Sequence, residues 1–175
     1  MATSRQEPVH IDTAADHLAT YAFDKGGLTE ILSRIPASEG TDRVGLEYEA
    51  QLLKIITVGW GISYFMEGRG EKQALVKASW SGIQAFSQNL DSVTSMMTGT
   101  QIDYFQTIRQ RLDTYLTALR QQPEATDPVA VFGPTYAECC GHADNVHVIM
   151  AGNRVFSGTL QAVREYLVHI AFESP

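Results

Sequence analysis

The sequence predicts a mainly α protein, a bundle of five to six helices with a small C-terminal β-hairpin and a closing helix, so that the whole is α+β. Three observations predict this fold class. Apolar residues recur every three or four positions over most of residues 10–122, as in helices. Residues 52–66 are apolar on nearly all sides. After residue 128, apolar residues instead occur at every second position, as in a strand. The alternative is an all-α fold in which residues 143–150 are helical.

The chain is long enough for one domain with a substantial core, because 44% of its 175 residues are hydrophobic. We expect a flexible tail over residues 1–9 and a single globular domain over residues 10–175. Within that domain, residues 10–122 form the helical bundle, and residues 128–175 form a strand, hairpin and helix unit packed on it.

Two short helices are expected to open the domain. Thr13 and Asp16 resemble a capping box for the first helix, which the glycine pair at 26–27 closes. The second covers LTEILSRIP and stops at Pro36. The polar turn ASEGTD follows, and either Thr41 or Asp42 can cap the next helix.

A long third helix is predicted to be the central element of the fold. Its apolar residues recur at helical spacing, and its opposite face is also apolar, which is typical of a helix buried on several sides. The recurring positions are Tyr48, Leu52, Ile55, Gly59, Ile62 and Met66. Gly59 and Gly61 each cost roughly 1 kcal/mol in a helix interior relative to alanine. We therefore expect a neighbouring backbone or ring to pack closely against them.

The fourth helix is predicted from Leu75 to Met97 and is ended by Gly99, and the fifth runs from Ile102 to Leu119. Between Lys77 and Asp103 the only charged residue is Asp91, whereas serine and threonine are abundant. Interface cores are depleted in charge. We expect residues 78–102 to be covered by another subunit or a partner; alternatively, this helix is enclosed in its own domain and its hydroxyls bond locally.

The C-terminal third carries β-type signals. PVAVF (128–132) is a short β-favouring run, and NVHVIMAGNRVFSG (145–158) predicts a hairpin whose turn is Ala-Gly-Asn. Between them, PTYAECCGHA (134–143) reads as a short helix with Pro134 in its first turn. Thr159 can cap the closing helix, LQAVREYLVHIAF.

The segment YAECCGHADNVH (136–147) is the densest group of chemically capable side chains. Thiolate, imidazole and carboxylate groups are zinc ligands, usually four at a time. The candidate ligands of a divalent metal such as zinc are Cys139, Cys140, His142, Asp144 and His147. Their spacing contains neither CxxC nor HExxH. The alternative is structural, with small buried cysteines and histidines that are packed or at the surface.

A thiolate paired with an imidazole that Asp144 orients would suit acyl transfer. However, residues 121–153 contain no lysine or arginine, and the acidic residues there raise a thiol pKa rather than lower it. No catalytic residue is assigned for this reason. Adjacent Cys139 and Cys140 would more easily link two subunits than form a ring with each other.

The formal net charge of −7 argues against a nucleic-acid partner, which would require clustered lysine and arginine. The apolar run at 52–66 is interrupted by Lys54 and is shorter than the roughly 20 residues of a membrane span. The N-terminus lacks an export signal and the two cysteines form no disulfide framework, so we expect a cytoplasmic protein.

The predicted function is that of an acidic, non-enzymatic interaction factor: a regulator, an adaptor, or an inhibitor or immunity-type protein. It would bind a protein partner or self-associate through residues 78–102, and its acidic surface would suit a basic partner. The alternative is a small metal- or ligand-binding protein that uses the cluster at 138–147.

Overall fold

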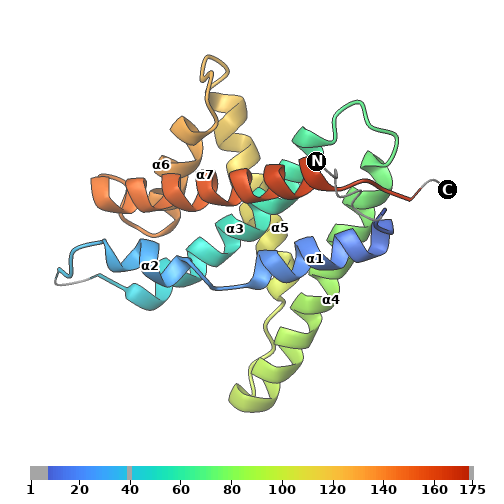
Figure 1. The fold of residues 1–175 in the computed structure, drawn as a ribbon. Helices are drawn as coiled ribbons and strands as arrows, with labels where there is room; N and C mark the ends of the chain where they lie inside the picture. Colours follow the sequence, from blue (N-terminus) through green and yellow to red (C-terminus); the bar gives the residue numbers. More distant parts are fainter. Residues whose placement is uncertain (1–7, 39–40, 174–175) are drawn as a thin grey trace.

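The computed structural model describes residues 8–38 and 41–173, which form seven α-helices (Figure 1). The mainly helical prediction is confirmed. In chain order the helices are α1 (Ile11–Phe23), α2 (Leu28–Ser33), α3 (Arg43–Phe65), α4 (Lys72–Thr98), α5 (Tyr104–Gln121), α6 (Val129–Cys139) and α7 (Val146–His169).

Helix α3 is the centre of the fold, as its apolar pattern predicts. It contacts each of the other six helices, and 14 of its 23 residues are buried. Asp42 is its N-cap and accepts a hydrogen bond from the Gly45 amide at 3.0 Å. The expected ring is found at Gly59, where Trp80 packs closely, whereas Gly61 contacts the aliphatic side chains of Val163 and Leu160.

Lys54, the charged residue within the apolar run, is buried in α3 with only 3% exposure. Its Nζ donates to the Asp24 carbonyl at 2.5 Å and lies 4.2 Å from the centre of the Tyr21 ring. Gln51 donates to the Ala22 carbonyl at 2.6 Å. Both side chains therefore satisfy carbonyls at the C-terminal end of α1, which otherwise lack intrahelical partners. Burial lowers the pKa of Lys54, and nearby Asp24 partly opposes this shift.

The predicted strand at 128–132 and hairpin at 145–158 are wrong. The first segment belongs to α6, and the second lies within the uninterrupted 24-residue helix α7, so the all-α alternative describes the C-terminal third (Figure 1). Within residues 8–38 and 41–173 the only β-pairing is an isolated bridge between Val9 and Phe172.

The glycine that suggests a hairpin turn is instead needed for helix packing. A Cβ on Gly152 would lie 2.7 Å from Cδ1 of Tyr136, so α6 and α7 approach closely at this position. Gly133 has the same role on α6, where a Cβ would lie 2.8 Å from the Ile149 carbonyl oxygen. Tertiary packing therefore overrides the local turn and β-branched signals of this segment.

Several predicted helix ends also differ. Pro134 lies in the interior of α6 because the helix begins five residues earlier, at Val129. Thr159 is buried inside α7, and the N-cap of that helix is Asn145, whose side chain accepts from the amides of residues 147 and 148. At α1 the N-cap is His10 rather than Thr13. By contrast, Gly99 ends α4 as predicted, with a left-handed φ of 68°.

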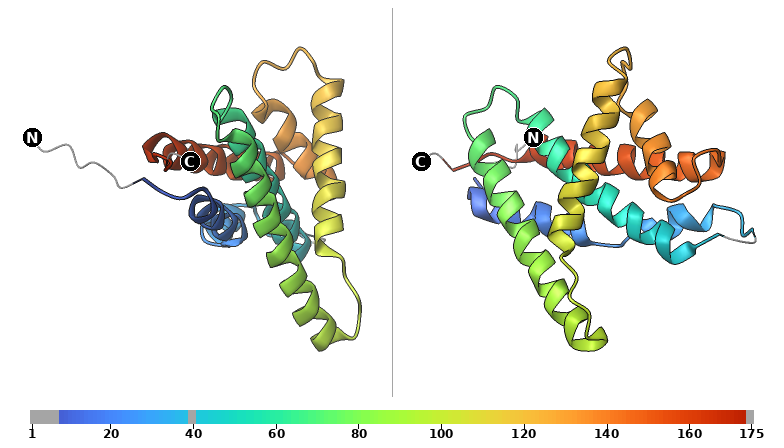
Figure 2. Two further views of the ribbon diagram at one scale, coloured as in Figure 1. Left: turned by 90° about the vertical axis from the view of Figure 1, so that its right-hand side faces the viewer. Right: turned by 180° about the vertical axis from the view of Figure 1, so that it is seen from behind.

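The two described ends of the chain lie side by side (Figure 2). The Val9 amide donates to the Ala171 carbonyl at 2.8 Å, and the Glu173 amide donates to the Val9 carbonyl at 3.3 Å. Residues 1–7 of the predicted tail lie outside the described residues. Of the helices described, none has both the length and the apolar character that crossing a bilayer would demand.

Candidate functional site

The Cys/His segment at 136–147 covers the end of α6, a tight turn and the first residues of α7. Cys139 is the last residue of α6, and Gly141 follows with a left-handed φ of 74°. The Gly141 amide donates to the Glu138 carbonyl at 2.9 Å, and the His142 amide donates to the Ala137 carbonyl at 2.8 Å. These two bonds form a Schellman motif, which accounts for the glycine at this position.

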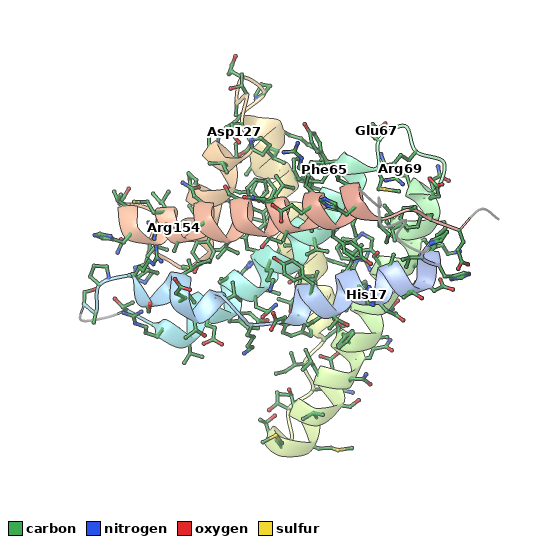
Figure 3. All side chains as sticks on the ribbon, viewed as in Figure 1. His17, Phe65, Glu67, Arg69, Asp127 and Arg154 are labelled. Atoms are coloured by element: carbon green, nitrogen blue, oxygen red, sulfur yellow. The ribbon has the colours of Figure 1, made fainter. Side chains whose placement is uncertain are left out.

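The predicted ligands have different surroundings. Cys139 and Cys140 are half-buried beside the Glu49–Arg111 ion pair, whereas Asp144 is exposed. His147 lines a small depression next to α2 together with Arg34 and Arg154, and Arg154 is labelled in Figure 3.

His142 is half-buried in the turn itself. In the part of the chain that the structure describes, no three His, Cys, Asp or Glu side chains are grouped so that they could hold a metal ion. Metal binding by Cys139, Cys140, His142, Asp144 and His147 stays a prediction, without support from this geometry.

The charges of Glu49 and Arg111, a polar pair that no motif in the sequence indicates, act on the two thiols. Glu49, on α3, is only 6% exposed, and its carboxylate accepts two hydrogen bonds from Arg111 on α5, at 2.7 Å and 2.5 Å. These hydrogen bonds raise the pKa of Arg111. The bidentate geometry is the strongest form of this ion pair. No signal in the sequence pairs two residues that are 62 positions apart.

Two buried tyrosines complete the surroundings of the thiols. The Tyr136 hydroxyl donates to the Leu46 carbonyl at 2.9 Å and so joins α6 to α3. Tyr115 is 1% exposed, and its hydroxyl has no hydrogen-bond partner among the described residues. Burial raises the pKa of both phenols. The site is therefore a tightly packed junction of α3, α5 and α6.

Neither cysteine is activated as a nucleophile. Burial is the largest of the causes that raise the pKa of Cys140 to about 12. Burial also raises the pKa of Cys139, and Arg111 opposes that shift. The thiolate is the reactive form of cysteine, so both residues are held in their unreactive state at neutral pH.

We expect both thiols to react slowly with a disulfide reagent while the protein is folded. At pH 8 the rate should be about a hundredfold lower for folded protein than for protein in denaturant, because few thiolates form and access is restricted. Absorbance of the released thiolate measures this rate, and Cys139→Ser and Cys140→Ser variants assign it to each residue. Equal rates in the folded and unfolded protein would contradict the inactive state.

The second candidate is the C-terminal part of α4, residues 88–98, which we call the α4 arm. The arm extends beyond the other helices (Figures 1 and 2). The buried residues of α4 end at Ser87, and the apolar side chains that follow are in solvent: Leu90 is 41% exposed, Val93 55%, Met96 87% and Met97 82%. The alternative of a helix fully enclosed in its own domain is therefore wrong for residues 88–98 of α4.

The arm presents almost no charge. Its single charged residue is Asp91, which is half-buried and accepts a hydrogen bond from the Tyr104 amide at 2.9 Å. Asp91 thereby satisfies an amide at the start of α5 and fixes the segment that returns from the arm. Ile102, on that returning segment, adds a further apolar side chain with 39% exposure.

Comparison with models of known protein families, with curated proteins and with solved structures gave no significant match.

Proposed function

We propose that the protein is a non-enzymatic interaction factor that self-associates through the α4 arm, with the arms of two copies packed against each other. The observation that carries this proposal is the exposed, uncharged face formed by Leu90, Val93, Met96 and Met97. Contiguous exposed apolar patches on soluble proteins mark places where another surface binds. The raised pKa values of Cys139 and Cys140 give no support to catalysis by a cysteine nucleophile.

Charge favours a second copy as the occupant of the arm. The chain carries a net charge of −7, so two copies repel each other over most of their surfaces. The arm limits this repulsion because Asp91 is its single charged residue, and that carboxylate is directed at the Tyr104 amide at the start of α5. A partner of opposite charge is normally selected by charged residues, and the arm offers none for that purpose.

The shape of the arm suits a two-fold contact. In such a contact the same patch occurs on both subunits, so one apolar helix face is complementary to its own copy. Eleven helical residues span roughly 17 Å, which gives an interface below the standard of about 800 Å² per partner. We therefore expect a dimer that dissociates on dilution. Met96 and Met97 favour such a contact because their unbranched side chains adapt to an apposed surface.

The test is sedimentation equilibrium over a range of protein concentrations. Wild-type protein should change from monomer to dimer, and Val93→Asp/Met97→Asp should weaken the dimer by about a hundredfold or more, because each carboxylate would be buried without a partner. Both positions are exposed in the single chain, so the helical circular dichroism and the melting temperature should change little.

The matched control is Gln73→Asp/Ser157→Asp, which adds the same charge at exposed positions outside the arm. It should dimerise nearly as well as the wild type. The proposal fails if wild-type protein is monomeric at all concentrations, if the arm variant dimerises normally, or if the control loses the dimer to the same extent.

A further inference from the structure

A groove lies on another part of the molecule, between α1 and the N-terminal half of α4. Its volume is about 1100 Å³. The walls come from one face of each helix, and the groove is bordered by His10 and Glu173, near the bridge between Val9 and Phe172. This volume exceeds the range of about 300–1,000 Å³ that is usual for small-molecule pockets, and the groove is open to solvent.

The floor of the groove consists of small apolar positions. Ala15 contributes from α1, and Ala74, Ala78 and Gly82 contribute from α4. The two helices pack tightly at Gly82, where a Cβ would lie 3.1 Å from the Cβ of Ala19. Small side chains on both walls leave room above the floor for a further apolar element.

The rim of the groove is acidic. It carries the carboxylates of Asp12, Asp16, Glu71 and Glu173, against a single lysine, Lys77. Asp12 and Glu71 lie at the starts of helices, where the helix dipole already favours a negative charge. Asp16 and Glu173 have no such explanation, and neither forms an ion pair within the described residues.

His17, which follows Asp16 on α1, points away from the groove. His17 lies on the side of α1 that faces α7 (Figure 3), where its Nδ1 is 2.9 Å from the Tyr166 hydroxyl. Asp12 and Asp16, the acidic residues of α1, instead line the groove, together with buried Ala15.

We propose that this groove binds a basic amphipathic helix of a partner protein. An apolar floor between acidic rims is complementary to a helix with an apolar stripe flanked by lysine or arginine. The inference names the partner class of the interaction factor proposed above and in that sense rests on it, but it involves a different surface from the arm.

A small polycation fits the observations less well. It would use the carboxylates of the rim but not the apolar floor formed by Ala15, Ala74 and Ala78. Helix-in-groove recognition uses both features at once, because the apolar stripe provides affinity and the flanking cations fix orientation.

The probe is a synthetic helical peptide of leucine and lysine, about 18 residues or roughly five turns long, with leucine at helical spacing. Isothermal titration calorimetry should detect saturable one-to-one binding to each protein chain. A peptide of the same composition with scrambled order should bind at least about tenfold more weakly, because its apolar residues no longer form one stripe. Spermine, which has charge without an apolar face, should compete poorly.

Three variants locate the binding. Asp16→Asn/Glu173→Gln should weaken it about tenfold, whereas the matched control Asp113→Asn/Glu124→Gln, with the same charge change at exposed positions outside the groove, should leave it nearly unchanged. Ala74→Trp fills the groove from an exposed position and should abolish binding without altering the charge.

The inference is overturned if the control weakens binding as much as the groove variant, if Ala74→Trp binds normally, or if spermine displaces the peptide as effectively as unlabelled peptide does. Repeating the titration with Val93→Asp/Met97→Asp separates the two proposals. Unchanged peptide binding to a monomeric arm variant supports both, and a dimer that binds no peptide refutes the groove alone.

Discussion

Gly152→Ala should lower the free energy of unfolding by about 2 kcal/mol, although alanine is ordinarily the better helix former. The added Cβ would lie 2.7 Å from Cδ1 and 2.9 Å from Cβ of Tyr136. Tyr136 is fully buried and its hydroxyl holds the Leu46 carbonyl, so the ring cannot move away without losing that bond. Denaturant unfolding followed by circular dichroism gives the free energy.

The control is Gly158→Ala on the same helix. A Cβ at Gly158 meets nothing within 4 Å, so this variant should be more stable than the wild type by about 0.5–1 kcal/mol. If the free energy of unfolding falls for Gly152→Ala and rises for Gly158→Ala, the close crossing of α6 and α7 is located at Gly152. If both variants were stabilised, the tight contact at Gly152 would be refuted.

The second large effect concerns the Glu49–Arg111 pair. Arg111→Met should cost about 3–4 kcal/mol, because it leaves the buried carboxylate of Glu49 without its partner. Glu49→Met should cost less, since the Arg111 side chain is 31% exposed and can still reach water. Chemical denaturation of the two single variants and the double variant completes a double-mutant cycle.

The double variant Glu49→Met/Arg111→Met should recover most of the lost stability, because apolar side chains of similar size replace the pair without leaving a buried charge. Additive losses in the cycle would contradict an energetically coupled pair. Cys139 and Cys140 are an internal reporter, since opening of this junction should speed their reaction with a disulfide reagent.

The long helices could be predicted because their apolar residues repeat over many turns. Helix α3 illustrates this: its period is confirmed, Asp42 is the cap of the two residues that the sequence offers, and the expected ring packs against Gly59. The role of Lys54 could not be foreseen. A lysine within an apolar run indicates an interruption, whereas its amine reaches a carbonyl on another helix, which no local pattern encodes.

The C-terminal error has a specific physical cause. Glycine followed by asparagine is a strong turn signal when only neighbouring residues are considered. Gly152 is present because the Tyr136 ring, 16 positions earlier, occupies the space of its side chain. Glycine for a turn and glycine for a helix crossing look the same in one sequence, so the hairpin could not be distinguished from α7.

The candidate sites also differ in whether a local signal in the sequence could reveal them. The lack of charge over 78–102 can be seen in the sequence because charge is a local property, but it does not separate the buried first part of α4 from the exposed residues 88–98. The surroundings of Cys139 and Cys140 depend on Glu49 and Arg111, which come from two distant helices. The groove between α1 and α4 likewise requires the relative placement of two helices.

The bridge between Val9 and Phe172 makes the described chain nearly a closed ring. Since the two described ends meet, a short linker between them would leave the packing of the seven helices in place. The same structure could be reached by a chain that starts in the exposed turn after α5, at Gln122–Glu124, and runs through the joined ends. We expect the same packing to accept this second order of the helices as well.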